Sequence, residues 1–339
     1  MREAGLSRGM TFGARGAARG VALAAALLLS IALPQQVKAA DACAPDVVTM
    51  VVPYAPGGVV DLIARVVADD LRTSIGQNVI VENKAGAGSN IGTAHVARAA
   101  PDGRTLIMAS AAHTINPSLY EKQTFDAIKG FAPIGLVGVV PNLIVVPPDF
   151  PANSMAELVA YAKANPGKIA FGSAGAGSSP HLAIEMLKVK TGTDMLHVPY
   201  QGQPQAVQDL LGNRIQVMAL TMTLALPLVK EGRLKALAIT STKRSDELPN
   251  VPTVAETVSP GFDVVNYLAV LAPAATPEKI IACYSTALRA GLAKPEVIAR
   301  LRPMGVTITP STPAEAAAFM VKDRDTWADV IRQANIKVQ

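Results

Sequence analysis

The stretch Pro53-Tyr54-Ala55-Pro56-Gly57-Gly58-Val59-Val60-Asp61 directly follows the apolar run Val47–Val52. The prolines and glycines predict the end of a short strand, and apolar residues then recur at helical spacing as far as Leu71. The stretch therefore predicts a strand, a tight turn and a helix start. In open α/β sheets, ligands bind at this end of a strand. Because the first N–H groups of a helix lack partners and the helix dipole is positive there, an anion such as a carboxylate fits.

A second stretch, Gly172-Ser173-Ala174-Gly175-Ala176-Gly177-Ser178-Ser179-Pro180-His181, has the same design. It is not a nucleotide-binding P-loop, because no Gly-Lys-Ser/Thr follows it. A third glycine stretch, Gly86–Gly92, departs from the dinucleotide fingerprint in its glycine spacing. For each loop the alternative is a plain tight turn with a helix cap, and Asp61 is placed to cap the first helix.

The remaining sequence continues the alternation of strands and helices. Short apolar runs predict strands at 79–81, 104–109, 169–172, 195–198, 215–219, 234–239 and 264–271. Capped or periodic segments predict helices at 91–98, 154–164, from 179, 204–211, 224–230, from 277 and 312–333. This rhythm is typical of an α/β fold with mostly parallel sheets flanked by helices. The 339 residues suffice for about two domains of ~100–200 residues each.

The N-terminus carries the pattern of an export signal. Four arginines precede the apolar run 20–33, and small residues follow it. The run is shorter than the ~20 residues of a transmembrane helix, and an anchoring or amphipathic helix is the alternative. We therefore predict an export signal peptide over residues 1–42, with cleavage after Ala39, Ala40 or Ala42. Cleavage after Ala42 would leave Cys43 first, as in a lipoprotein.

The composition excludes several classes of function. Half of the residues are apolar, which excludes disorder as the main state. Residues 1–40 hold five basic residues and one acidic residue, so the remainder has 26 basic and 25 acidic residues and a charge of +1. With so few aromatic residues, this near-neutral body offers no surface for nucleic acid. The two cysteines, Cys43 and Cys283, could form a disulfide or remain separate thiols.

The sequence contains no recognisable catalytic or metal-binding motif. It has no Gly-x-Ser-x-Gly, and its four histidines lack the His-Glu-x-x-His spacing. We therefore predict a protein without catalytic residues, metal or cofactor, although a triad assembled only in the folded protein leaves no motif in the sequence. His113 and His181 lie beside the loops and are candidates for ligand binding.

The pattern Pro-x-x-Pro-Gly-Gly-x-x-Asp at Pro53–Asp61 resembles the opening signature of the Bug family, the periplasmic substrate-binding proteins of tripartite tricarboxylate transporters. The resemblance continues in order through the stretches 81–92, 100–103, 115–120, 172–181, 197–200, 236–240 and 248–256. It implies a type II-like periplasmic-binding-protein fold whose two lobes, joined by two crossing strands expected at 139–146 and 264–270, close over a small carboxylate. The implied lobes are residues 44–142 plus 265–339, and residues 143–264.

The resemblance also assigns candidate ligand-binding residues. The first lobe provides Tyr54, Pro56, Gly57, Gly58, Asp61, Ser110 and His113. The second provides Ser173, Gly175, Ser178 and His181. Two further candidates, Thr221 and Tyr267, lie where the chain departs from the family: Leu220 replaces an aspartate, and Asn266-Tyr267-Leu268-Ala269 replaces a Ser-Trp-x-Gly-like stretch. Because these changes reduce polarity, we expect a ligand less polar than citrate or aspartate, such as a monocarboxylate or an aromatic acid.

The resemblance further implies a monomeric periplasmic protein that delivers its ligand to membrane permease subunits. Two alternatives remain at this point. One is an exported hydrolase, which needs a nucleophile beside a histidine. The other is a ligand-sensing protein that acts on a signalling partner.

Overall fold

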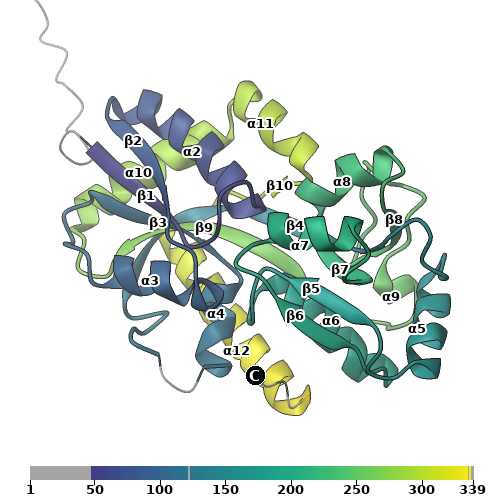
Figure 1. Ribbon diagram of the computed structural model, residues 1–339. Helices are drawn as coiled ribbons and strands as arrows, with labels where there is room; N and C mark the ends of the chain where they lie inside the picture. Colours follow the sequence, from purple (N-terminus) through teal and green to yellow (C-terminus); the bar gives the residue numbers. More distant parts are fainter. Residues whose placement is uncertain (1–46, 121–122, 335, 337–339) are drawn as a thin grey trace, which may run out of the picture. The chain divides into compact units, whose positions relative to one another are not determined.

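The computed structural model describes residues 47–120, 123–334 and 336 (Figure 1). The predicted signal peptide, its cleavage sites and Cys43 lie outside these residues. The strands are β1 (Val47–Val52), β2 (Asn78–Asn83), β3 (Thr105–Ser110), β4 (Phe131–Val146), β5 (Ala170–Ser173), β6 (Leu196–Pro199), β7 (Val217–Thr221), β8 (Lys235–Ile239), β9 (Val265–Pro273) and β10 (Thr307–Ile308). Every strand predicted from the sequence is present within a few residues, whereas β10 and the first part of β4 were not predicted.

Helices alternate with these strands. They are α2 (Val59–Ile75), α3 (Asn90–Ala97), α4 (Ala112–Ile115), α5 (Met155–Ala164), α6 (Ser179–Thr191), α7 (Gln203–Leu211), α8 (Met222–Lys230), α9 (Val254–Thr257), α10 (Glu278–Leu292), α11 (Pro295–Leu301) and α12 (Pro313–Ala334). Three short 3-10 helices are η1 (Ala87–Ser89), η2 (Asn116–Ser118) and η3 (Arg302–Met304). No described helix is long and apolar enough to cross a membrane.

The strands form one path in the order β2-β1-β3-β9-β4-β7-β5-β6, with β8 and β10 also paired to β4. The outer strands are parallel, as predicted: β1 pairs with β2 and β3, and β5 with β6 and β7. Strands β4 and β9 run antiparallel to each other; β9 is also antiparallel to β3, and β4 to β7. We call the elements around β1, β2, β3 and β9 the first lobe, and those around β5–β8 the second lobe.

Strand β4 belongs to both lobes. Residues 131–141 pair with β9, and from Asn142 onward the strand pairs with β7 and β8. At this change of partner, the Asn142 N–H donates to the Thr240 hydroxyl and the Thr240 N–H donates to the Asn142 carbonyl, both at 2.9 Å. The two lobes are thus connected by one continuous strand that pairs with β9 before Asn142 and with β7 and β8 from Asn142 onward.

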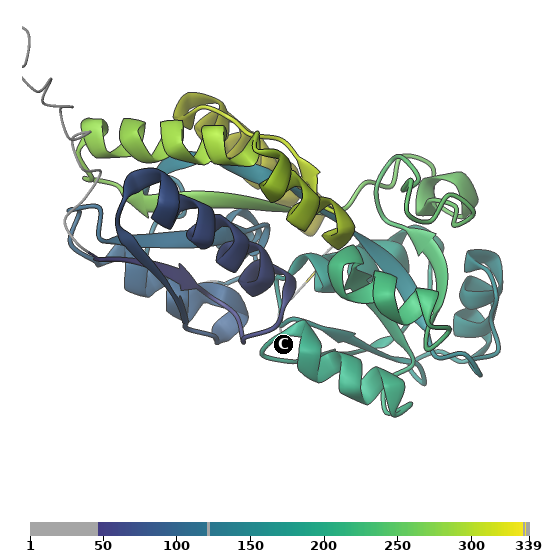
Figure 2. The same ribbon diagram turned by 90° about the horizontal axis from the view of Figure 1, so that it is seen from above.

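Two apolar layers cover the two faces of this path. Alternate residues of each strand point to opposite faces, so that Leu106 and Met108 join one layer and Ile107 the other. The first layer packs against α2, α7, α8, α10 and α11, and the second against α4, α5, α6 and α12. Helices α2 and α10 lie side by side in both views (Figures 1 and 2). Cys283 on α10 is disulfide-bonded.

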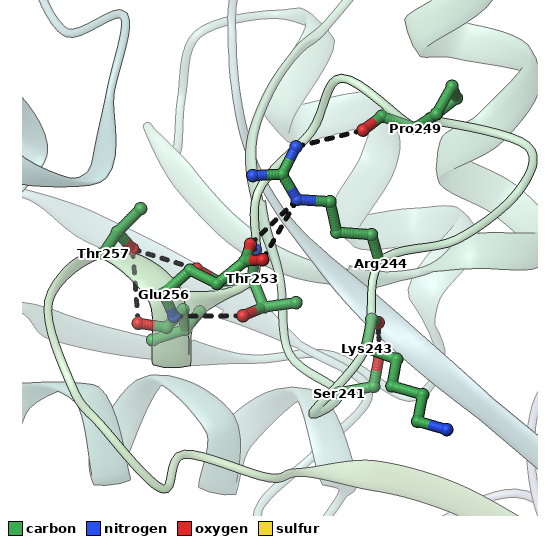
Figure 3. Close-up of polar contacts among 8 residues, drawn as sticks. Ser241, Lys243, Arg244, Pro249, Thr253, Glu256 and Thr257 are labelled. Atoms are coloured by element: carbon green, nitrogen blue, oxygen red, sulfur yellow. Dashed lines mark hydrogen bonds and ion pairs between the residues drawn. The ribbon is translucent and has the colours of Figure 1, made fainter.

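The long segment between β8 and α9 is held by a surface cluster around Arg244 (Figure 3). Arg244 Nε donates to Glu256 at 2.9 Å and Nη1 donates to the Pro249 carbonyl at 3.1 Å. Thr253 and Glu256 cap α9 reciprocally, with the Thr253 hydroxyl accepting from the Glu256 N–H. This cluster fixes the stretch 248–256 that carries part of the sequence pattern described above.

Candidate functional site

A narrow cavity lies where the carboxyl ends of strands from both lobes meet. It contains about 350 Å³ of space between atoms, counted to where it opens to solvent. Its lining residues are Tyr54, Gly58, Val59, Val60, Ser110, Ala174, Ser178, Ser179, Pro180, Gly202, Gln203, Thr221 and Asn266. This position, beyond the ends of the parallel strands, is where open α/β sheets bind ligands.

Three helices begin at the cavity wall. Gly58 precedes α2, Ser178 precedes α6 and Gly202 precedes α7, and all three residues line the cavity. None of these helix starts has a side-chain cap hydrogen bond, so their first N–H groups remain available to a ligand. Each dipole also places partial positive charge at the cavity. The arrangement favours an anion, although the lining contains no lysine or arginine.

The hydroxyl groups of the wall add further donors. Tyr54 and Ser110 share one hydrogen bond of 3.1 Å, and Tyr54 also interacts with Ser89; when Tyr54 donates to Ser110, the Ser110 hydroxyl keeps its hydrogen for a ligand. Burial raises the pKa of Tyr54 above its ordinary value, although the bond to Ser110 lowers it, so the phenol remains protonated. The wall can therefore bind a carboxylate through neutral donors alone.

Asp61 stabilises the first glycine loop from behind the cavity. Its carboxylate accepts from Gly57 N–H at 2.9 Å, from Arg65 at 2.9 and 3.0 Å, and from Asn83 Nδ2 at 3.0 Å. Asn83 also donates to the Tyr54 carbonyl at 3.0 Å. Burial alone would raise the pKa of Asp61, but these hydrogen bonds lower it below its ordinary value. Asp61 does not line the cavity, so its structural role is to hold the loop rather than to face a ligand.

Replacing Asp61 by asparagine is expected to lower the free energy of unfolding by about 2 kcal/mol, because the new NH₂ group faces donors only. Urea unfolding at pH 7.5 measures this change. The matched control is Glu256→Gln, which breaks the exposed Arg244 ion pair (Figure 3) and should leave the urea midpoint almost unchanged. Equal losses in the two variants would contradict the role assigned to Asp61.

Two stacked histidines support the second glycine loop. The rings of His181 and His197 lie 4.1 Å apart, and Phe171 stacks on His197 at 4.9 Å. His181 Nδ1 accepts from Gly177 N–H at 3.2 Å, and His197 Nε2 shares a 2.7 Å hydrogen bond with Ser173. Burial lowers the pKa of His181 to about 3 and that of His197 to about 4. Both rings are therefore neutral, and His181 serves as a hydrogen-bond acceptor for the loop.

The glycine loops of the two lobes touch beside the cavity. The Tyr120 hydroxyl donates to the Ala176 carbonyl at 3.2 Å. A Cβ atom on Gly88 would overlap that same carbonyl, and one on Gly177 would overlap Asn116 Oδ1. Four consecutive residues of the first-lobe loop, 86–89, have positive φ, including the non-glycine residues Ala87 at 46° and Ser89 at 85°. This strained turn brings bare backbone into contact with the opposite lobe.

Comparison with known proteins assigns the family. Residues 63–336 match the family described as the tripartite tricarboxylate transporter family receptor. This chain belongs to that family. The receptor is similar to the structure of the periplasmic binding protein BugD, with 37% identity, a TM-score of 0.84 and coverage of 87% of this chain and 99% of the other.

Two ligand-bound structures from Rhodopseudomonas palustris are also similar to the receptor. Rpa4515 with adipate is 31% identical with a TM-score of 0.84, covering 86% of this chain and 98% of the other. MatC with bound malate is 30% identical with a TM-score of 0.82, covering 85% and 99%. The family consists of periplasmic solute-binding receptors, not enzymes, which confirms the predictions of family, fold class and absence of enzymatic function.

The receptor's cavity brings together only some of the residues that the sequence singled out. Tyr54, Gly58, Ser110, Ser178 and Thr221 line it. Pro56 and Gly57 are exposed in the first loop, and Ser173, Gly175 and His181 build the second loop from behind the wall. The glycine loops therefore contribute backbone groups and a few side chains to the cavity wall. The other predicted residues of the loops stabilise them from behind the wall.

His113 and Tyr267 face away from the cavity, on the opposite side of the sheet. His113 packs against Phe125 and Phe131, and its Nε2 shares a 2.7 Å hydrogen bond with the Ala127 carbonyl. The Tyr267 hydroxyl shares a 3.1 Å hydrogen bond with Thr114. Because side chains alternate along β9, Tyr267 belongs to the layer below the cavity and its neighbour Asn266 faces the ligand space.

Sequence reasoning missed two amide side chains of the receptor, Gln203 and Asn266. Gln203 follows Gly202 and precedes Pro204 after strand β6, which repeats the strand, glycine and helix-start pattern of the other two loops. That signal was available in the sequence. To identify Asn266, one must know which alternate side chains of β9 face the cavity, and the apolar run 264–271 does not show this. Among the described residues, no cluster of histidine, cysteine, aspartate or glutamate is placed to hold a metal ion.

Proposed function

We propose that the receptor captures a small carboxylate in the periplasm by closing its two lobes and delivers it, as a monomer, to membrane permease subunits. The observation that carries this proposal is the meeting of three uncapped helix starts from both lobes at one cavity without charged side chains. Neutral N–H and O–H donors in a partly apolar wall suit a carboxylate bound to an apolar body. The ligands of the two similar structures, adipate and malate, are small carboxylic acids of the kind proposed here.

The lobes proposed for this closure are residues 44–142 plus 265–339, and residues 143–264. The change of partner along β4 at Asn142 and the start of β9 at Val265 support these boundaries. A hinge at two crossing strands allows each lobe to move as a body. Val59, Val60, Ala174 and Pro180 in the wall support a ligand less polar than citrate, such as an aliphatic or aromatic acid.

A thermal-shift screen of the mature protein tests the proposal. At a concentration of about 100 times its dissociation constant, a true ligand should add about 2.7 kcal/mol to the free energy of unfolding. The panel contains aliphatic monocarboxylates, aliphatic dicarboxylates, aromatic acids and citrate, each with its amide as a control. We expect stabilisation by one of the first three classes and none by the amides.

Two outcomes would contradict the proposal. Stabilisation by citrate alone would overturn the less polar ligand, and no response to any carboxylate would overturn carboxylate binding. Uptake of the radiolabelled ligand by cells with and without the gene then tests delivery to a permease, since a receptor with another role would leave uptake unchanged.

A further inference from the structure

Two buried carboxamides in the cavity wall point their oxygens into the protein. Gln203, with 3% of its surface exposed, accepts a hydrogen bond on Oε1 from the Thr221 hydroxyl. Asn266, with 5% exposed, accepts on Oδ1 from the Ala111 N–H at 3.2 Å. Neither amide nitrogen has a hydrogen-bond partner among residues 47–120, 123–334 and 336, and both residues line the cavity. Each side chain therefore offers its NH₂ group to a ligand.

The partners of these oxygens fix both orientations. The Ala111 N–H can only donate, so turning Asn266 over would place two donors together. The Thr221 hydroxyl has no hydrogen-bond partner other than Gln203 in the described part of the chain. Turning Gln203 over would leave that buried hydroxyl hydrogen without an acceptor. Thr221 thus determines which end of Gln203 faces the ligand.

Most other polar groups of the wall also present hydrogens. The Ser179 hydroxyl accepts from Asn142 Nδ2 at 2.9 Å and keeps its own hydrogen for a ligand. Ser178 is an exception, because its hydroxyl donates to the Gly175 carbonyl at 2.6 Å and offers only lone pairs. The wall contains no carboxylate. An ammonium group on the ligand would therefore face hydrogen-bond donors on most sides of the cavity.

Building on the proposed function, we propose that the site selects carboxylates that lack an ammonium group, and that Thr221 is the residue that sets this selectivity through Gln203. An ammonium has three hydrogens and no lone pair, so it needs acceptors that the fixed carboxamides withhold. A hydroxyl at the same position can accept from either NH₂ group. The site should therefore admit 2-hydroxy acids and reject 2-amino acids.

Isothermal titration calorimetry on the mature protein tests this with matched series of acids. The series are succinate, malate and aspartate; glutarate, 2-hydroxyglutarate and glutamate; and 3-phenylpropionate, 3-phenyllactate and phenylalanine. In the series that binds, we expect the amino acid to bind at least about tenfold more weakly than the parent acid, and the hydroxy acid within about threefold of it.

Two variants separate Thr221 from general effects. In Thr221→Val, Gln203 can turn and present its oxygen, so the preference for the parent acid over the amino acid should fall at least about threefold. Thr223→Val is the matched control. It removes a threonine hydroxyl two positions along the chain that donates to the Met304 carbonyl and does not line the cavity, and it should preserve the preference. The parent acid and the amino acid differ in net charge, but this difference is the same in every variant. A change in preference between variants therefore does not arise from ligand charge.

The outcomes distinguish this inference from the proposed function. If no acid of these series and no carboxylate of the thermal-shift panel binds, the proposed function fails. If acids bind but their amino counterparts bind within about threefold, the selectivity is refuted while the function stands. If the preference exists but survives in a folded Thr221→Val variant, the assignment to Thr221 is overturned.

Discussion

Replacing Gly88 by alanine is expected to weaken ligand binding by at least about 100-fold, which corresponds to about 2.7 kcal/mol. The new Cβ would overlap the Ala176 carbonyl, where the two lobes meet beside the cavity, and would also approach the Tyr120 hydroxyl. Under the proposed closure, the lobes could not reach this contact. Calorimetric titration with the ligand found in the screen measures the loss of affinity.

Gly76→Ala is the matched control for this substitution. Gly76 has φ of 68°, close to the 59° of Gly88, and a Cβ there meets nothing within 4 Å. Both variants bear the same cost of a left-handed alanine, about 1 kcal/mol, and only Gly88→Ala adds the contact with the other lobe. Similar affinities for the two variants would show that the glycine contact plays no part in binding.

Acidification from pH 7.5 to pH 5 should reduce the free energy of unfolding by about 4 kcal/mol. Burial lowers the pKa of His113 and His197 to about 4 and that of His181 to about 3, whereas an unfolded histidine titrates near 6.5. Between these values the unfolded chain binds more protons, so stability present above pH 6.5 is lost as the pH falls. The two fully buried rings contribute about 2 kcal/mol each and the half-buried His197 about 1 kcal/mol.

Asp323 opposes this trend. Burial raises its pKa to about 6, so protonation between pH 6 and its unfolded value near 4 favours the folded state by about 1 kcal/mol. Urea unfolding at the two pH values measures the sum of these contributions. A change smaller than about 1 kcal/mol would contradict the neutral, buried state of the histidines.

The variant His181→Asn identifies the group responsible. Its side-chain oxygen can accept from Gly177 N–H in place of Nδ1 and cannot take up a proton. We expect it to remove about 2 kcal/mol of the loss between pH 7.5 and pH 5, since Glu185 and Lys188 beside the ring remain unchanged. His95→Asn, at an exposed histidine of α3, is the control and should preserve the full loss.

The sequence predicted the alternating elements well because their signals are local. Apolar periodicity defined α2, and the Ser154 and Thr312 caps marked the starts of α5 and α12. The length of β4 was not predicted, because Pro133, Gly135, Gly138 and Pro141 interrupt its apolar pattern and pairing with β9 supplies the missing regularity. The largely apolar runs 139–146 and 264–271 could be recognised as strands, whereas the earlier part of β4, which prolines and glycines interrupt, could not.

Residues of the candidate site could be predicted only where backbone geometry determines them. Gly58 and Ser178 follow from the strand, turn and helix-start pattern, which is visible in the sequence. Asp61 and His181 are polar residues near the same turns, yet their hydrogen bonds point back into the loops. Whether such a side chain faces a ligand or its own turn depends on partners such as Asn83, which are distant in sequence.

The passage of β4 through both lobes has a consequence for how the receptor melts. If either lobe unfolded, β4 would lose its hydrogen-bonding partners in that lobe, although the other lobe also contains part of β4. The unpaired N–H and C=O groups would be exposed. A calorimetric scan should therefore record one cooperative heat-absorption peak rather than two. A fragment that contains only one lobe would therefore have an incomplete sheet, so we expect neither lobe to fold on its own.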